Sequence, residues 1–249
     1  MLRGCRATTW RINFLMMRSM MPTDLHRNIS EVTRRIRSAE ASAGRAKNSV
    51  SLLAISKTKS AELIRIAYQQ GLTAFGENYA QEILDKASLL ADLPIEWHFV
   101  GPIQSNKTAT IATYCDWVHS VDRLKIARRL SEQRPPGKDP LNVLIQVNIS
   151  GESSKSGVTP EALPDLAESV SLLPGILLRG LMAIPAPQRP DASPRAAFSA
   201  LRELKDDLAL ALPDLDTLSM GMSADLEEAI AEGATLVRVG TDIFGARYN

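Results

Sequence analysis

Short apolar runs rich in β-branched residues alternate along the chain with segments whose apolar residues recur at helical spacing. The first helical segment, for example, carries Leu25, Ile29, Val32 and Ile36 on one face and is followed by Gly44. The pattern predicts helices over residues 24–43, 60–70, 79–90, 105–114, 123–133, 160–172, 195–211 and 224–232. It predicts strands over residues 51–56, 73–76, 96–100, 117–121, 142–149, 177–184, 215–219 and 235–239, with a short tail after the last.

Strands that alternate with helices pair in parallel through right-handed crossovers. Eight consecutive units, with no linker or shift in composition between them, predict a single-domain α/β protein with the (β/α)8 TIM-barrel fold. An open doubly wound sheet is the alternative. The residues after the first strand read SKTKS, however, and lack the glycine-rich turn that dinucleotide-binding sheets use at this point.

Composition agrees with one globular domain, since the 249 residues are 45% hydrophobic and 23% charged. The net charge of +1 is unevenly distributed, because residues 1–21 hold four arginines and no acid. The remaining residues include 25 basic and 28 acidic side chains, a net charge of −3. Nucleic-acid binding is therefore not expected of the folded part of the chain.

The segment 1–21 is expected to be a disordered extension or the product of a misassigned start, and the barrel is expected over residues 22–249. Met16, Met17, Met20 and Met21 all offer later starts. The apolar stretch INFLMM is too short for a secretory signal, whereas an organelle transit peptide fits the composition. No stretch is long enough to span a membrane.

The cysteines and histidines indicate neither a disulfide framework nor a metal site. Cys5 and Cys115 lie far apart in the sequence, which favours a cytoplasmic location. His26, His98 and His119 are scattered and have no carboxylate at a spacing typical of metal ligands.

Catalytic and binding groups of such barrels lie at the carboxyl ends of the strands, and phosphate often binds on the loops after strands seven and eight. The seventh strand is followed by residues 219–223 (SMGMS), and the eighth by Gly240 and Thr241. Ser223 is expected to cap the helix 224–232. These two loops predict a phosphate site, the alternative being that Ser223 is only a cap and Gly240 only a turn.

Lys57 follows the first strand directly, and closure of the barrel would place it beside these phosphate loops. A partly desolvated amine next to a phosphate pocket suits formation of a Schiff base with an aldehyde, and pyridoxal 5'-phosphate (PLP) carries both groups. Arg238 lies within the last strand and could pair with a carboxylate or face a pyridine nitrogen, which it would keep unprotonated. Lys57 at the rim of the barrel could also be an ordinary solvated charge.

Eight motifs carry a resemblance to a known family. They are LLAISKTK (52–59), FGENYAQE (75–82), WHFVGPIQSNK (97–107), NVLIQVNIS (142–150), SKSGV (154–158), RGLMAIP (179–185), LSMGMSADLEEAI (218–230) and VRVGTDIFGAR (237–247). Together they resemble the pyridoxal phosphate homeostasis protein family, single-domain relatives of the alanine racemase barrel. The resemblance runs from about residue 24 to the carboxyl terminus.

The resemblance implies a role for each matching residue. It implies that Lys57 holds PLP as a lysine aldimine, that Arg238 faces the pyridine nitrogen, and that Lys155 is a second lysine near the mouth of the site with a part in PLP exchange. The resemblance also implies that Asn78 contacts the cofactor. It implies that a phosphate cradle is formed by Ser219, Ser223, Gly240 and Thr241.

The family implies a protein for intracellular PLP homeostasis that binds, buffers and delivers the cofactor without turnover. PLP and apo forms of PLP-dependent enzymes are the partners that this role implies, and a monomer is expected. The alternatives are a PLP-dependent amino-acid racemase or related enzyme, and a phosphate-binding barrel without PLP. Racemases of this fold carry a second β-rich domain, for which the ten residues after the last predicted strand leave no room.

Overall fold

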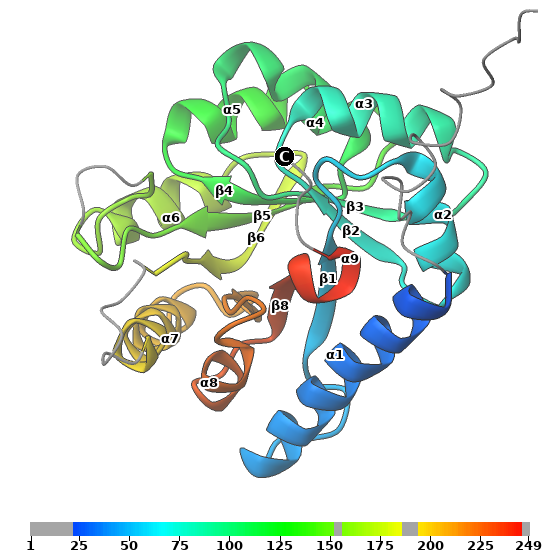
Figure 1. The fold of residues 1–249 in the computed structure, drawn as a ribbon. Helices are drawn as coiled ribbons and strands as arrows, with labels where there is room; N and C mark the ends of the chain where they lie inside the picture. Colours follow the sequence, from blue (N-terminus) through cyan, green and yellow to red (C-terminus); the bar gives the residue numbers. More distant parts are fainter. Residues whose placement is uncertain (1–21, 152–155, 186–193, 246–249) are drawn as a thin grey trace, which may run out of the picture.

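The eight strands close into one parallel barrel in which each strand pairs with its neighbours in the sequence and β8 pairs with β1 (Figure 1). The structure is a computed structural model, which describes residues 22–151, 156–185 and 194–245. The predicted extension 1–21 and Lys155 lie outside the described residues. The strands are β1 (Ser51–Ile55), β2 (Ala74–Glu77), β3 (Glu96–Phe99), β4 (Trp117–Val121), β5 (Leu141–Gln146), β6 (Ile176–Met182), β7 (Thr217–Ser219) and β8 (Leu236–Val239).

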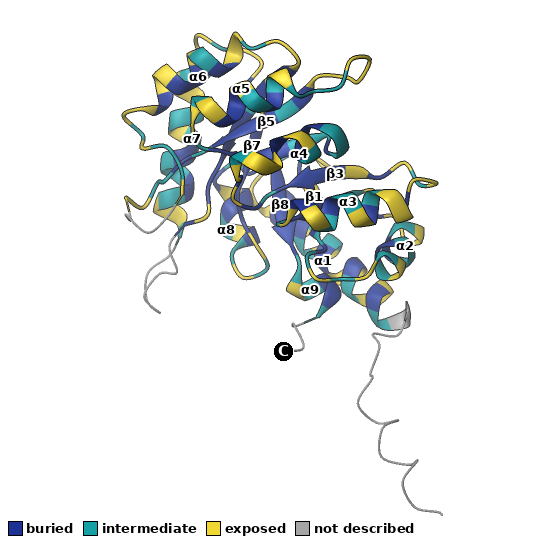
Figure 2. Ribbon diagram, turned by 90° about the horizontal axis from the view of Figure 1, so that it is seen from above, coloured by how far each residue is buried: buried dark blue, intermediate teal, exposed yellow. Residues whose placement is uncertain are grey.

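Helices surround this barrel and bury their apolar faces against it, while their outer faces stay exposed (Figure 2). They are α1 (Pro22–Ser42), α2 (Ala61–Gln69), α3 (Ala80–Leu89), η1 (Ser105–Lys107), α4 (Thr108–Tyr114), α5 (Leu124–Glu132), α6 (Leu163–Ser171), α7 (Arg195–Ala209), α8 (Leu226–Ala231) and α9 (Thr241–Phe244). The prediction of a TIM barrel is confirmed, and each predicted strand and helix has its counterpart.

The differences lie at the ends of the elements. Strands β5 and β6 end earlier than predicted, at Gln146 and Met182, and the predicted helix 105–114 begins with the separate turn η1. The residues after β8 form the short helix α9, which the sequence pattern left as a tail. Four residues are too few to show a helical period, so this element has no signal in the sequence.

The prediction that Ser223 caps α8 is wrong. The cap residue is Asp225, and α8 begins at Leu226, two residues later than predicted. Residues 223–225 form a turn in which the Met222 N–H donates to the Asp225 carboxylate at 2.6 Å. This turn leaves Ser223 at the carboxyl end of the barrel, ahead of the helix.

The barrel brings the ends of β1 and β8 together, as expected from closure. Leu53 pairs with Arg238, and Ala54 pairs with Val239. The residues that follow these two strands therefore leave the sheet side by side, at the same edge of the barrel.

Candidate functional site

A cavity of about 310 Å³ opens at the carboxyl ends of the strands. Its wall includes residues that follow β1, β2, β7 and β8, together with Arg238 from within β8. The lining residues are Ile55, Lys57, Lys59, Asn78, Val100, Ile184, Met222, Ser223, Ala224, Arg238, Gly240, Thr241 and Gly245. Six of the predicted site residues thus share one cavity, which we call the mouth pocket, and Ser219 lies below it.

Lys57 occupies the point at which β1 ends. The last sheet hydrogen bond of this strand is donated by the Ser56 N–H to the Gly76 carbonyl at 3.0 Å, so the chain turns away from the sheet at Lys57. The Lys57 side chain is half-buried. Lys59, two residues further on, also lines the mouth pocket, and burial lowers its pKa. The structure therefore places an amine in a partly desolvated position, which suits attack on a carbonyl carbon.

Arg238 is buried inside the barrel and forms the floor of the mouth pocket. Its guanidinium donates to the Ser219 carbonyl and hydroxyl, both at 2.6 Å, and to the Ala183 carbonyl at 2.9 Å. Burial lowers the pKa of Arg238 to about 10, while the charge of Asp225 opposes this shift. The side chain stays protonated at neutral pH and is held rigidly by the ends of β6 and β7.

Ser219 belongs to a hydrogen-bonded chain that runs through the interior of the barrel. Its hydroxyl lies 2.9 Å from His119 Nδ1, His119 Nε2 lies 2.9 Å from His98 Nδ1, and His98 Nε2 lies 2.7 Å from Glu96. Burial lowers the pKa of His119 well below its usual value, so this ring is neutral. Ser219 therefore supports Arg238 from below, and the two histidines that looked scattered in the sequence lie in contact.

The loops after β7 and β8 bring Ser223, Gly240 and Thr241 to one side of the mouth pocket. Gly240 packs closely against β1, and a Cβ there would lie 3.2 Å from the Ile55 carbonyl oxygen. Gly221 adopts φ 90°, and a Cβ there would lie 2.6 Å from the Ala229 side chain. Both loops are consequently compact, and they present two hydroxyl groups and backbone to the cavity.

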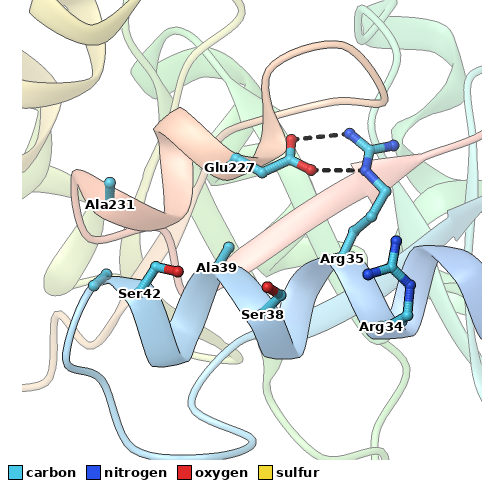
Figure 3. A pocket seen from close by; sticks show the side chains of 8 residues that line it. Arg34, Arg35, Ser38, Ala39, Ser42, Glu227 and Ala231 are labelled. Atoms are coloured by element: carbon cyan, nitrogen blue, oxygen red, sulfur yellow. Dashed lines mark hydrogen bonds and ion pairs between the residues drawn. The ribbon is translucent and has the colours of Figure 1, made fainter.

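Arg35 on α1 holds these two loops from the outside. Its guanidinium donates to the Ser223 carbonyl at 2.9 Å, to Asp242 at 2.7 Å and to Glu227 at 2.7 and 2.9 Å. Figure 3 shows the paired contacts with Glu227 beside a second cavity, of about 320 Å³, between α1 and α8. This role was not predicted from the sequence, because Arg35 is 188 residues from Ser223 and no local pattern links them.

Asn78 follows β2 and faces the mouth pocket next to Val100. Its backbone packs tightly against Gly101, where a Cβ would lie 2.1 Å from the Asn78 carbonyl oxygen. The loop after β3 therefore fixes the position of Asn78 in the wall of the mouth pocket.

Glu77, the last residue of β2, is a buried carboxylate on the opposite side of this strand end. It accepts hydrogen bonds from Lys86 at 2.7 Å and from Ser56 at 2.6 Å. Burial raises the pKa of Glu77 to about 7, against the opposing effect of Lys86 and Ser56. A carboxyl pKa that is higher in the folded than in the unfolded chain makes folding favour the protonated form.

We therefore expect the Glu77 contribution to stability to be present at low pH and to be lost as the pH rises from about 4.5 to about 7. Glu77→Gln removes this titration. The free energy of unfolding of the natural protein, minus that of the variant, is expected to fall between these pH values in urea melts. Parallel pH profiles for the two proteins would contradict the expectation.

Two absences concern the residues that the structure describes, 22–151, 156–185 and 194–245. No group of three or more histidine, cysteine, aspartate or glutamate side chains is arranged to hold a metal ion there. No helix of those ranges is long and apolar enough to cross a membrane.

Comparison with known proteins gives the family. Residues 28–248 match the family model described as alanine racemase, N-terminal domain. The pyridoxal phosphate homeostasis protein of Pseudomonas aeruginosa is 63% identical over 220 residues, which cover 88% of this chain and 94% of that protein. The chain belongs to the pyridoxal phosphate homeostasis protein family.

Solved structures agree with this membership. PipY of Synechococcus elongatus, in the structure described as having PLP bound, has a TM-score of 0.76 and 34% identity, covering 89% of this chain and 100% of that one. Alanine racemase of Corynebacterium glutamicum has a TM-score of 0.65 and 16% identity, covering 91% of this chain and 62% of that one. The similarity to alanine racemase shows a shared fold, and the pyridoxal phosphate homeostasis family has the nearer sequences.

Proposed function

We propose that this chain binds PLP in the mouth pocket and takes part in intracellular PLP homeostasis. The observation that carries the proposal is the convergence of Lys57, Arg238 and the hydroxyl-bearing phosphate loops on one cavity of about 310 Å³. Such a cavity is large enough for a single small ligand. The family membership supports the choice of PLP, since a homologous structure is described as holding it.

Lys57 is the proposed attachment point. Its Nζ forms a bond to the aldehyde carbon of PLP, and the aldehyde oxygen leaves as water after taking up two protons from the amine. The pocket then holds the product through groups on three sides. Asn78 and the phosphate loops contribute to the wall, and Arg238 lines the pocket from within β8.

Arg238 is proposed to face the pyridine nitrogen of the ligand. A guanidinium carries only donors, so the nitrogen would accept a hydrogen bond and stay unprotonated. An unprotonated ring withdraws electrons weakly from the attached carbon, which suits storage of PLP better than chemistry on it. Ser219 supports this arrangement by accepting a hydrogen bond from Arg238, while lying outside the lining of the pocket.

The phosphate is proposed to lie against Ser223, Gly240 and Thr241. Hydroxyl and backbone amide donors form charge-assisted hydrogen bonds with phosphate oxygens, which are stronger than those between neutral groups. Arg35 keeps the loops together through the Ser223 carbonyl and Asp242.

Ser223→Ala is expected to weaken retention of PLP, because it removes one hydroxyl from the phosphate side of the pocket while leaving the covalent attachment possible. Loss of one hydrogen bond to a charged group predicts dissociation about tenfold faster or more. Release of PLP into a scavenging solution measures this rate. Ser88→Ala, on the exposed face of α3, is the matched control, and equal release rates for both variants would count against the loop.

We propose a carrier in preference to an enzyme. Lys57, Lys59 and Arg238 are the ionisable side chains among the described residues that line the mouth pocket. Racemisation requires a proton donor and a proton acceptor on opposite faces of the substrate carbon. Incubation with a panel of amino acids tests this point: no exchange of enantiomers and no amine release are expected, and robust turnover would favour the racemase alternative.

Lys155 stays a prediction as the second lysine involved in PLP exchange, because it lies outside the described residues. Delivery to apo enzymes and the monomeric state are likewise proposals that rest on the role of a carrier.

A further inference from the structure

Lys57 lies in a tight turn with an unusual residue at its third position. The turn spans Ser56 to Lys59 and is closed by the Lys59 N–H, which donates to the Ser56 carbonyl at 3.0 Å. Thr58 adopts φ 64° there, in the left-handed region. Such a turn usually has glycine or asparagine at this position, and a β-branched residue there is strained unless its surroundings hold it.

Helix α3 provides this hold. The Thr58 N–H donates to Glu82 Oε2 at 2.8 Å, and Lys86 Nζ donates to the Ser56 carbonyl at 3.0 Å. The residues immediately before and after Lys57 are therefore both bonded to side chains of one helix. Glu82 and Lys86 lie one turn apart on it.

The same side chains form a closed ionic cluster behind the turn. Lys86 Nζ lies 2.5 Å from Glu82 Oε2 and 2.7 Å from Glu77 Oε1, and the Ser56 hydroxyl donates to the same Glu77 oxygen at 2.6 Å. Lys86 and Glu77 are buried. Charge-assisted hydrogen bonds are strong and directional where water is excluded, so the cluster is a rigid support.

Glu82 is held in its ionised form. Although burial opposes ionisation, hydrogen bonds from Lys86 and from the Thr58 N–H hold the pKa of Glu82 below its usual value. The carboxylate thus remains an acceptor for the Thr58 amide at neutral pH.

The far end of the turn is attached to the segment that follows β8. Lys59 Nζ donates to the Phe244 carbonyl of α9 at 3.2 Å. The turn that carries Lys57 is therefore tied to α3 on one side and to the helix that begins at Thr241 on the other.

We propose that Glu82 and Lys86 are positioning residues for Lys57, and that by gripping Ser56 and Thr58 they hold the strained turn in the conformation that directs the lysine amine into the mouth pocket. The proposal rests on the proposed function, in which Lys57 is the attachment point for PLP. A nucleophile that is aimed in advance does not have to lose conformational freedom during the reaction, which speeds bond formation.

The test is the rate of covalent attachment in Glu82→Ala, followed from the visible absorption of the lysine adduct after mixing with PLP. Loss of a hydrogen bond to a charged group predicts a rate lower by about tenfold or more. The Thr58 amide is also expected to exchange its hydrogen with solvent faster in the ligand-free variant. Asp85→Ala is the matched control, because Asp85 is an exposed residue of the same helix. Among the described residues, its carboxylate accepts a hydrogen bond from the Gln81 side chain and does not contact the turn.

Thr58→Gly separates positioning of the turn from a general effect on α3. Glycine adopts φ 64° without strain, so the turn no longer depends on the Glu82 carboxylate. Thr58→Gly in the Glu82→Ala background is therefore expected to restore most of the lost rate. A role of Glu82 in helix packing alone would give no such rescue.

Two results would overturn the proposal: an unchanged attachment rate in Glu82→Ala, or a lower rate that Thr58→Gly does not restore. If Glu82→Ala lacks the circular dichroism spectrum of the natural protein, Glu82→Gln replaces it. This variant exchanges the charged acceptor of the Thr58 amide for a weaker neutral one and removes the ion pair with Lys86, so a smaller loss of rate is expected and an unchanged rate again overturns the proposal. Lys57→Ala is measured in the same series. An adduct that persists in Lys57→Ala would refute the proposed attachment point. Loss of the adduct in Lys57→Ala, together with an unchanged rate in Glu82→Ala, would refute only the positioning role.

Discussion

Lys57→Ala is expected to abolish the covalent adduct with PLP that borohydride reduction traps in the natural protein. The variant lacks the amine to which PLP is proposed to attach. Lys59 is the other lysine among the described residues that line the mouth pocket, and its amine is engaged by the Phe244 carbonyl. PLP should still bind through the phosphate loops and Arg238, but reversibly. The reduced protein, examined by mass spectrometry, should show no added mass.

The same variant should fold normally, because Lys57 is half-buried at the mouth of the barrel and contributes little to the apolar core. The thermal midpoint of the ligand-free variant is therefore expected to match that of the natural protein. Lys107→Ala, elsewhere on the carboxyl side of the barrel, is the matched control for loss of one lysine and should keep the adduct. A trapped adduct in Lys57→Ala would mean that another lysine is the attachment point.

Arg238→Ala is expected to cause the largest loss of stability among the changes considered. The substitution removes three hydrogen bonds from the interior, which leaves the Ser219 carbonyl, the Ser219 hydroxyl and the Ala183 carbonyl without that donor. The Ser219 carbonyl keeps the Ala183 N–H as a donor, and the Ser219 hydroxyl keeps its contact with His119. The cost is therefore the loss of three hydrogen bonds from a charged donor, each contributing about 1.5–3 kcal/mol, partly offset where water enters from the pocket. A total of about 3–5 kcal/mol predicts a thermal midpoint lower by about 10 °C.

The measurement is calorimetry of the ligand-free protein, so that a change in PLP affinity does not affect the result. Arg65→Ala is the control, because its ion pair with Asp92 is on the surface and contributes little to stability. A midpoint for Arg238→Ala equal to that of the control would show that the interior tolerates the loss of this arginine. The hydrogen bonds from Arg238 to Ser219 and Ala183 would then contribute little to the free energy of unfolding.

The order of strands and helices was predictable from two patterns. Most strands are short apolar runs, and in the long helices the apolar residues recur at helical spacing. The ends of the elements were less predictable. The helix α8 begins after Asp225, whose carboxylate accepts from the Met222 N–H, and neither fact is visible from the spacing of apolar residues. The short helix α9 has no periodic signal at all.

The site was predictable to the extent that its residues follow strands. Lys57, Asn78, Ser223 and Thr241 line the mouth pocket because closure of the barrel gathers the strand ends. Ser219, also predicted as a cofactor contact, is not among the residues that line the mouth pocket. Its hydroxyl accepts a hydrogen bond from Arg238, a contact that the strand pattern does not show.

The supports behind the site could not be predicted, because they are tertiary contacts between residues with no local pattern. Arg35 reaches Ser223 across 188 residues of sequence, and Glu82 reaches Thr58 across 24. The left-handed conformation of Thr58 is also hidden, because threonine is not a residue that sequence reasoning assigns to such a turn.

The most direct test of the account is peptide mapping of the natural protein after loading with PLP and reduction with borohydride. The account predicts that the added mass lies on Lys57, within the peptide that contains the motif LLAISKTK. Mapping to any other lysine, or recovery of an unmodified chain after saturation with PLP, would contradict it.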